Sequence, residues 1–176
     1  MKFWDCFWYL IIISIAAFFV GRLLPKKWFR AELFPYRSYG FEKNGRIYEK
    51  LYIRRWMNKM LDMSRILPFM MPPKRLTGDC ERRLPRMIQE TCVAEFIHGT
   101  NCIAGLYCLW LYPGVGGVII ALIYAVVFNL PYMIIQRYTR PQLVRLGRRF
   151  EERNKRRAEQ YAEKEKKTDE NADPEL

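Results

Sequence analysis

The fold is decided by residues 92–135, which read CVAEFIHGTNCIAGLYCLWLYPGVGGVIIALIYAVVFNLPYMII. Two apolar runs, Cys92–Tyr112 and Val115–Ile135, are separated by Pro113 and Gly114. Each run has about the 20 residues that a helix needs to cross the hydrocarbon core of a bilayer. The stretch therefore predicts two membrane-spanning helices that fold back on a tight turn.

Polar residues interrupt this hairpin at matching depths. Residues equidistant from the turn of an antiparallel pair lie level, so we expect His98, the single histidine of the chain, beside Asn129. Glu95 is then opposite Tyr132. At about 1.5 Å per residue these groups are roughly 23 Å from the turn, short of the far side of a core about 30 Å thick. Pro131 has no backbone N–H, which frees a carbonyl acceptor near Asn129.

Glu95 and His98 are candidate catalytic residues because both titrate inside an apolar span. Ionisable groups in lipid are costly and often mark function. Their spacing of three residues places a carboxylate beside an imidazole on one helix face. This pattern indicates a general base oriented by an acid. The alternative is that the polar groups only hold helices together, a role that Ser, Thr, Asn and small residues fill more often.

The chain is strongly basic, with 30 Lys and Arg against 18 Asp and Glu and a formal net charge of +12. Its length of 176 residues fits one domain. A basic balance is typical of proteins that meet nucleic acid, anionic lipid or a phosphorylated substrate, and the membrane spans argue against nucleic acid. Most basic residues fall in 22–86 and 137–167, which the positive-inside rule places in the cytoplasm. Topology and attraction to anionic lipid explain most of the excess.

The five cysteines do not indicate a disulfide framework or a metal centre. They include no C-x-x-C pair, and their number is odd. Cys102 is four residues after His98, but no second ligand pair exists for a zinc site. We expect reduced, structural cysteines, no metal site and no bound cofactor.

Residues 3–24 form another apolar run, long enough to span a membrane. A secretory signal is the alternative, but Asp5 lies where such signals are basic, and no A-x-A motif precedes a plausible cleavage point. Lys2 is the one basic residue before the run, whereas Arg22, Lys26 and others follow it closely. This asymmetry favours a retained helix with the amino terminus outside.

Residues 26–87 are too apolar for a free linker. Apolar side chains at helical spacing predict an interfacial amphipathic helix. They are Ile53, Trp56, Met57, Met60 and Leu61. Leu67–Pro73 is a proline-punctuated apolar patch that we expect to rest on the bilayer. After Pro141 the chain becomes dense in both charge signs, which favours a solvated, fraying helix with a disordered acidic end.

The expected architecture is an all-α membrane protein with three transmembrane helices and an interfacial amphipathic segment between the first and second. The predicted divisions are a first transmembrane helix (1–25), the interfacial segment (26–87), a transmembrane hairpin carrying the site (88–141) and a charged cytosolic tail (142–176). The protein is expected in the cell membrane, multi-pass, with the amino terminus outside and the carboxyl terminus cytoplasmic.

Common catalytic motifs are absent, including G-x-S-x-G, Walker A, G-x-G-x-x-G and zinc motifs. The His-x-x-x-x-Asp signature of glycerolipid acyltransferases also fails, since Ile103 stands in place of the acid. An ordered set of blocks between about Phe34 and Leu146 nevertheless resembles the glycosyl-diaponeurosporenoate acyltransferase family. The blocks are Phe41-Glu42-Lys43-Asn44-Gly45, Tyr48-Glu49-Lys50-Leu51, Arg54-Arg55-Trp56 followed by Asp62, Glu90-Thr91, Ala94-Glu95-x-x-His98, Asn129-Leu130-Pro131 and Gln136-Arg137-Tyr138-Thr139-Arg140-Pro141.

The resemblance implies the last step of staphyloxanthin-type carotenoid synthesis, in which a fatty acyl group is added to the primary hydroxyl of a sugar. This sequence departs from the family pattern at three positions. Thr139 stands where Asn is usual, Gln142 where a basic residue is usual, and Gly99 where an aromatic residue follows the histidine. These departures bear on the acceptor more than on the reaction class.

The expected reaction moves an acyl group from a thioester donor such as acyl-CoA to a hydroxyl of a lipid-anchored sugar. His98 is expected as general base, Glu95 as the residue that orients and charges it, and Asn129 as an oxyanion donor. The expected substrate-binding residues are Arg137, Arg140, Gln136, Arg54, Arg55 and Trp56.

The expected partners are the acyl donor, the sugar acceptor and anionic membrane lipid, and not nucleic acid. For the arginines, anchoring of the topology is the alternative. The alternative for the whole chain is a non-enzymatic membrane protein that binds lipid or takes part in an assembly.

Overall fold

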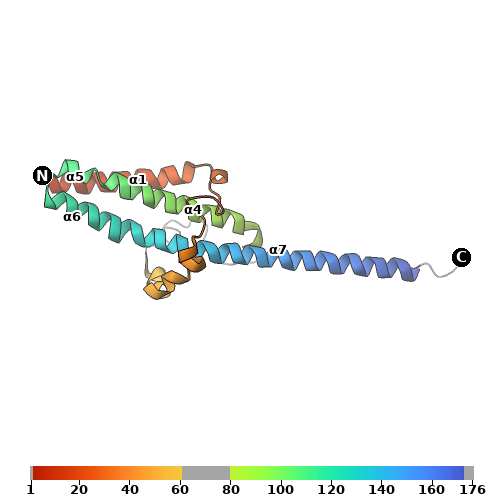
Figure 1. The fold of residues 1–176 in the computed structure, drawn as a ribbon. Helices are drawn as coiled ribbons and strands as arrows, with labels where there is room; N and C mark the ends of the chain where they lie inside the picture. The colour runs from red at the N-terminus through yellow and green to blue at the C-terminus, as the bar shows by residue number, and fades with distance from the viewer. Residues whose placement is uncertain (1, 61–79, 173–176) are drawn as a thin grey trace.

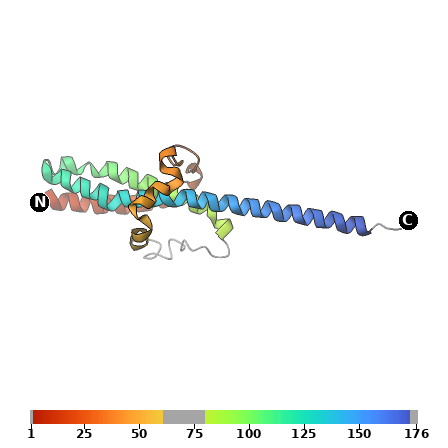
Figure 2. The same cartoon turned by 60° about the horizontal axis from the view of Figure 1, so that its bottom comes forward.

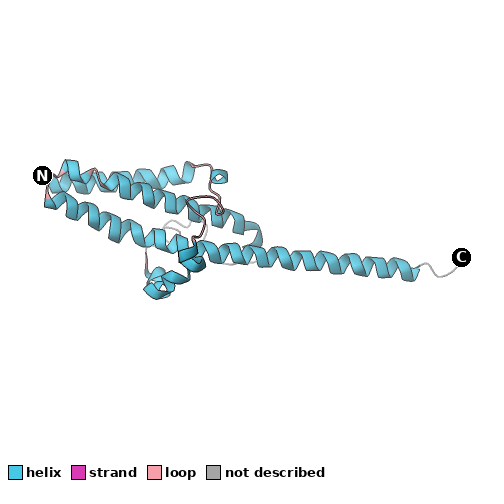
Figure 3. Cartoon of the chain, viewed as in Figure 1, coloured by secondary structure: helices cyan, strands magenta, loops and turns pink. Residues whose placement is uncertain are grey.

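The computed structural model describes residues 2–60 and 80–172 of the chain. Within these ranges every regular element is helical, as the colouring of Figure 3 shows. The predicted apolar patch Leu67–Pro73, together with Leu61 and Asp62, lies outside the described residues. The all-α class predicted from the sequence is confirmed.

Three helices of the described residues are long and apolar enough to cross a membrane, which is consistent with a membrane protein. The first is α1 (Lys2–Leu23), and the second is Glu81–Leu111, made of α4 (Cys80–Gly105) and the short α5 (Cys108–Leu111). The third begins at Val115, where α6 (Val115–Ile123) continues through the π-helical turn η4 (Tyr124–Asn129) into α7 (Leu130–Ala172). They lie side by side in Figures 1 and 2, and the three predicted transmembrane helices are confirmed.

The turn between the two spans of the hairpin depends on glycine. Gly114 has a φ of 101°, a conformation that L side chains rarely adopt. A Cβ at Gly117 would collide with the carbonyl oxygen of Tyr112, so the start of α6 can pack this closely on α5 only without a side chain. The predicted turn at Pro113-Gly114 is therefore built from backbone contacts.

Helix α1 is tied to the hairpin by small and polar residues. Cys6 is fully buried and packs against Cys108 and Ala121. The hydroxyl of Tyr9 donates to the carbonyl oxygen of Ala104 at 2.9 Å, and Ser14 shares a 2.8 Å hydrogen bond with Tyr124. Since apolar burial gives little preference between helix and lipid, such close packing and hydrogen bonding hold the three spans together.

The segment after α1 folds into short turns rather than one amphipathic helix. It contains η1 (Lys26–Trp28), η2 (Gly40–Leu51), α2 (Ile53–Trp56) and η3 (Met57–Lys59). The prediction of a longer interfacial helix starting at Ile53 is wrong for the described residues, because the α-helical geometry lasts four residues and Met60 is extended. Tyr52 (φ 52°) sets the chain direction just before α2.

Ile53 also differs from the expected membrane contact, because it is fully buried in the protein. The η2 segment lies across α7, in the orange part of Figures 1 and 2. The segment from 26 to 60 therefore packs against α7 and brings its own side chains to that helix.

The charged tail is not separate from the hairpin. Helix α7 passes through Pro141 without ending and continues to Ala172, projecting past the other helices in Figure 1. The described side chains from 151 onward are exposed. The predicted solvated helix is present, but it is the same helix that carries Asn129's neighbours, and the change of composition at Pro141 is no structural boundary. Similarly, α4 begins at Cys80, inside the segment that we expected to be interfacial.

Candidate active site

His98 and Asn129 face each other across the hairpin. The imidazole Nδ1 of His98 lies 3.0 Å from Oδ1 of Asn129. Asn129 is only 2% exposed, whereas His98 is partly accessible. The sequence predicted that these two residues lie level, since they are equally far from the turn. The hydrogen-bond distance confirms this prediction.

The Asn129 amide determines which ring nitrogen of His98 carries the proton. Its Nδ2 donates to the carbonyl oxygen of Tyr124 at 2.9 Å, so Oδ1 must be the atom that faces the imidazole. An amide oxygen only accepts, and Nδ1 of the neutral ring must therefore be the donor. The lone pair is left on Nε2, which is the arrangement that a general base needs.

The Tyr124 carbonyl that holds Asn129 stands at the start of the π-helical turn η4. In η4 the hydrogen-bond spacing is lengthened, and a π-turn inside an α-helix often accompanies a functional site. Pro131, the second residue of α7, supplies no backbone donor to the turn before it. The carbonyl of Tyr124 accepts from the Asn129 side chain, which fixes that side chain on the helix.

Tyr132 packs against one face of the imidazole ring. Its ring stacks on His98 with a centroid separation of 4.8 Å and an interplanar angle of 6°. We expected Tyr132 opposite Glu95, but it lies against the histidine one turn away. Stacking and the Asn129 hydrogen bond together restrict the ring to one orientation.

Glu95 does not have the expected role beside His98. Its Oε1 accepts from Nη1 of Arg137 at 2.6 Å, and its Oε2 accepts from Nη2 of Arg140 at 2.5 Å. The histidine is instead oriented by Asn129. The expected carboxylate–imidazole pair is therefore replaced by a carboxylate–arginine cluster. Each carboxylate oxygen of Glu95 is bound by one guanidinium group of α7.

Arg140 is buried and bound entirely by the protein. It is 3% exposed, and its Nε donates to Oγ1 of Thr91 at 2.9 Å. Its Nη1 donates to the carbonyl oxygen of Tyr36 at 2.7 Å, and its Nη2 donates both to the Thr91 carbonyl and to Glu95. With these donors engaged, Arg140 clamps α4, α7 and the segment around Tyr36 together. Its expected role in substrate binding stays a prediction.

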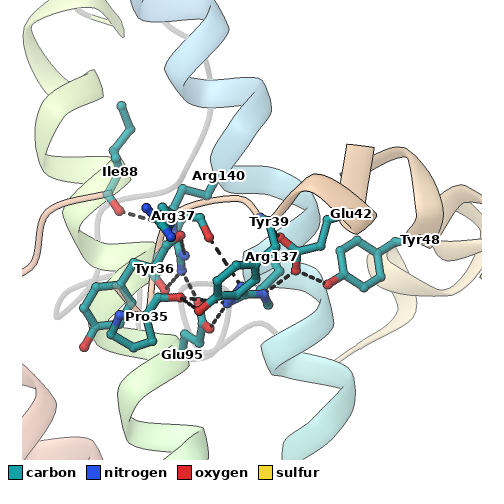
Figure 4. Close-up of polar contacts among 11 residues, drawn as sticks. Pro35, Tyr36, Arg37, Tyr39, Glu42, Tyr48, Ile88, Glu95, Arg137 and Arg140 are labelled. Carbon is teal, nitrogen blue, oxygen red and sulfur yellow. Dashed lines mark hydrogen bonds and ion pairs between the residues drawn. The ribbon is translucent and has the colours of Figure 1, made fainter. Parts of the chain in front are cut away.

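Arg137 joins a second carboxylate to the cluster. Its Nε donates to Oε1 of Glu42 at 2.6 Å, and Nη1 also reaches the carbonyl oxygen of Pro35 at 3.1 Å. The ring of Tyr39 lies under the guanidinium, 4.8 Å away. Figure 4 shows how α4, α7 and the chain from Pro35 to Tyr48 meet around the two arginines.

Glu42 is a site residue that the sequence did not reveal as one. It is 2% exposed and holds Arg137, while the Tyr48 hydroxyl donates to its Oε1 at 2.6 Å and the Tyr39 N–H to its Oε2. Burial opposes ionisation, but the hydrogen bonds from Tyr48, Arg137 and Tyr39 outweigh it and lower the pKa of Glu42. Burial, reinforced by Glu42, raises the pKa of Tyr48 to about 12. In the sequence Glu42 stands out only through the family resemblance, because its partner Arg137 is 95 residues away.

The remaining predicted site residues are separated from His98. Gln136 is buried on α7, two turns after Asn129. Arg54 donates from Nε to the Tyr138 hydroxyl at 2.8 Å, on the far side of the arginine cluster. Arg55 stacks over the ring of Tyr52, and Trp56 donates from Nε1 to the Leu51 carbonyl. These three residues line an outer surface, not the surroundings of the histidine.

The comparisons with known proteins match both halves of this arrangement. Residues 25–149, which include the segment carrying Glu42 and the hairpin carrying His98, match the family model of glycosyl-4,4'-diaponeurosporenoate acyltransferases. The chain belongs to this acyltransferase family. Membership makes it an enzyme of acyl transfer, against the alternative of a non-enzymatic lipid-binding or assembly protein.

Two curated members of the glycosyl-4,4'-diaponeurosporenoate acyltransferase family show how far the similarity extends. The protein of that name from Staphylococcus aureus strain N315 is 32% identical over 157 residues, covering 88% of this chain and 92% of the relative. The one from strain USA300 is 32% identical over 156 residues with the same coverage. No solved structure matches the chain. The candidate site described above is therefore argued from the geometry of this structure.

Proposed function

We propose that the chain transfers a fatty acyl group from a thioester donor to a sugar hydroxyl of a glycosylated carotenoid, with His98 as the general base. The acceptor class comes from the names of the family and its relatives. The observation that carries the proposal is the pair of hydrogen bonds from the Tyr124 carbonyl through Asn129 to Nδ1 of His98. This pair leaves Nε2 as the basic nitrogen.

In the proposed reaction His98 takes one proton from the acceptor and later gives it to the leaving group. Nε2 accepts the proton of the sugar hydroxyl while the hydroxyl oxygen forms a bond to the thioester carbonyl carbon, whose π electrons move to oxygen. The tetrahedral intermediate then collapses, and the carbon–sulfur bond breaks. The departing thiolate takes the proton from Nε2. The products are an ester and a free thiol, and His98 returns to its neutral form.

Asn129 has an orienting role in this proposal in place of the expected oxyanion role. Its oxygen holds Nδ1–H, and one of its N–H groups is already bonded to Tyr124. Glu95 is likewise a positioning residue. By binding Arg137 and Arg140 it joins α4 to α7 one turn from His98, which sets the depth and rotation of the ring.

The proposed location is the cytosolic leaflet of the cell membrane, with the amino terminus outside and the carboxyl terminus in the cytoplasm. The support is the basic content of residues 22–60 and of α7 beyond Arg137, which the positive-inside rule assigns to the cytosol. His98 lies towards that end of the hairpin. A soluble thioester donor would reach the base from the cytosol while the carotenoid stays in lipid, and anionic lipid would be attracted to the basic segments.

His98→Ala tests the base directly in purified protein supplied with acyl-CoA and a glycosylated carotenoid. We expect kcat to fall by about 10²–10⁴-fold, the range for loss of a general base, with membrane insertion retained. Thr100→Val is the matched control, because the Thr100 hydroxyl donates within its own helix, to the carbonyl oxygen of Ile97 at 2.9 Å. Retention of most activity in the alanine variant would remove the base assignment.

A further inference from the structure

A second polar site lies on α7, beyond the buried arginine cluster. It is a cleft of about 290 Å³ between η2, α2 and α7, and we name it the arginine cleft. The residues used below are Arg46, Glu49, Arg54, Tyr138, Gln142 and Arg145. Its volume is near the lower end of small-ligand sites, about 300 Å³.

Three arginines from three different elements converge on the arginine cleft. Arg46 comes from η2, Arg54 from α2 and Arg145 from α7. Among the described residues of the lining the one carboxylate is Glu49, which binds Nη2 of Arg54 at 2.7 Å. The cleft therefore has an excess of positive charge, and planar guanidinium groups are well matched to phosphate oxygens.

Two of the arginines are held in place by the fold. Nε of Arg54 donates to the Tyr138 hydroxyl at 2.8 Å, and Nη2 of Arg145 donates to the Asn44 carbonyl at 3.1 Å. Arg46 is exposed. Arg54 also binds Glu49, and Nε of Arg145 donates to the Pro141 carbonyl at 3.4 Å. All three arginines are nevertheless exposed, unlike the buried Arg140, so their remaining N–H groups face solvent.

The backbone beside the cleft is unusual. Lys43, Asn44 and Gly45 all have positive φ, at 47°, 56° and 88°. A Cβ at Gly45 would lie 3.2 Å from the Tyr138 carbonyl oxygen, so the loop approaches α7 closely. Non-glycine residues in this conformation are costly and are retained mostly where the surroundings impose them, often at binding sites. The strained loop brings Arg46 to the same surface as Arg145.

The cleft is offset from the base along α7. Tyr138 and Arg145 follow Asn129 by 9 and 16 residues, which at about 1.5 Å per residue corresponds to roughly 14 to 24 Å. A coenzyme A thioester has a comparable separation of its groups. Its phosphates are at one end of an extended pantetheine arm, and its reactive carbonyl is at the other. An acyl group pointing into the bilayer would then place its thioester near His98 and its phosphates near the cleft.

We propose that the arginine cleft binds the phosphate-bearing end of the acyl donor, with Arg46, Arg54 and Arg145 as its ligands. This inference rests on the proposed function, since it names the site for the donor of that reaction. The cleft is also a suitable size and charge for the phosphate of an anionic lipid headgroup. The test therefore separates the two sources.

The experiment measures binding of coenzyme A to the full-length protein in detergent micelles by titration calorimetry. We expect Arg46→Gln, and more strongly Arg46→Gln with Arg145→Gln, to raise Kd at least tenfold. Arg149→Gln is the matched control, because it removes the same charge from an exposed position one turn further along α7 and is expected to leave Kd unchanged. Arg54 is left intact because it supports Tyr138.

The same titration in His98→Ala protein separates this inference from the general-base proposal. Normal binding of coenzyme A without turnover supports the cleft whatever residue is the base. Unchanged Kd in both cleft variants overturns the inference, even if the enzyme is active. Failure of coenzyme A to bind, together with charge-dependent binding of phosphatidylglycerol nanodiscs that the double variant loses, also overturns it and assigns the cleft to lipid.

Discussion

Nη2 of Arg140 donates to Oε2 of Glu95 at 2.5 Å, and both side chains are buried between α4 and α7. This pair, extended by Arg137 and Glu42, is the point at which the two spans and the segment after α1 meet (Figure 4). It lies one turn from His98. The chemistry proposed for the histidine therefore depends on an ion cluster that does not itself contact it in the structure.

Removing one member of the pair is expected to destabilise the protein strongly. Glu95→Gln leaves the buried Arg140 without a counter-charge and Arg137 with Glu42 alone. Loss of one partner costs about 3–5 kcal/mol at a buried pair. The measurement is thermal or denaturant unfolding in detergent micelles. Glu163→Gln, which breaks an exposed ion pair with Lys167 on α7, is the control and is expected to cost less than about 1 kcal/mol. Equal effects of the two variants would contradict the buried-cluster interpretation.

Asn129→Ala is expected to affect kcat more than KM. Without the amide oxygen, the His98 ring is free to carry its proton on Nε2, so a large part of the population loses the basic nitrogen that faces the substrate. Steady-state kinetics should show kcat about 10–100-fold lower, within the range of a general-base effect, at nearly constant KM. The control is Asn101→Ala, which removes another buried asparagine of the hairpin. A change confined to KM would assign Asn129 to substrate binding.

Glu42 should make stability depend on acidic pH. Its pKa in the folded protein is below the ordinary value of 4.5, so its contribution is fully present above that value and is lost as the pH falls through the lowered pKa. We expect unfolding temperatures measured from pH 7 down to pH 3 to decline in the wild type. In Glu42→Gln the starting value should be lower and the decline shallower. Parallel curves would show that other carboxylates govern the acid response.

Gly45→Ala is expected to loosen the segment that crosses α7. The added Cβ meets the Tyr138 carbonyl at 3.2 Å, and a φ of 88° penalises a side chain by about 1–2 kcal/mol. Limited proteolysis between residues 40 and 60 should become faster. Gly40→Ala is the matched control, since a Cβ there meets nothing within 4 Å. If both variants resist the protease equally, the close approach of this loop to α7 does not contribute to its stability.

The hairpin was predictable because its information is local. Apolar runs of span length, separated by Pro113-Gly114, require two antiparallel helices, since a backbone in lipid must satisfy its hydrogen bonds internally. Once the turn is placed, equal counting from it brings His98 to Asn129 without further knowledge. The resemblance of the family blocks likewise needed only the order of residues along the chain.

The partners of Glu95 were not predictable in this way. Helical spacing favours His98, three residues away, but the structure gives the carboxylate to Arg137 and Arg140, more than forty residues later. The amphipathic pattern around Ile53 was misleading for a similar reason, because Ile53 is buried inside the protein and the α-helical geometry ends at Trp56.

The sequence by itself determined the class of the protein, its spans, its turn and the depth of its histidine. Only the tertiary structure decided which polar groups hold the helices together and which are free to act on a substrate. The physical reason is that a buried charge binds whichever opposite charge the folded chain brings within reach. That choice depends on Glu42, Arg137 and Arg140 meeting in space, and spacing along the chain does not encode it.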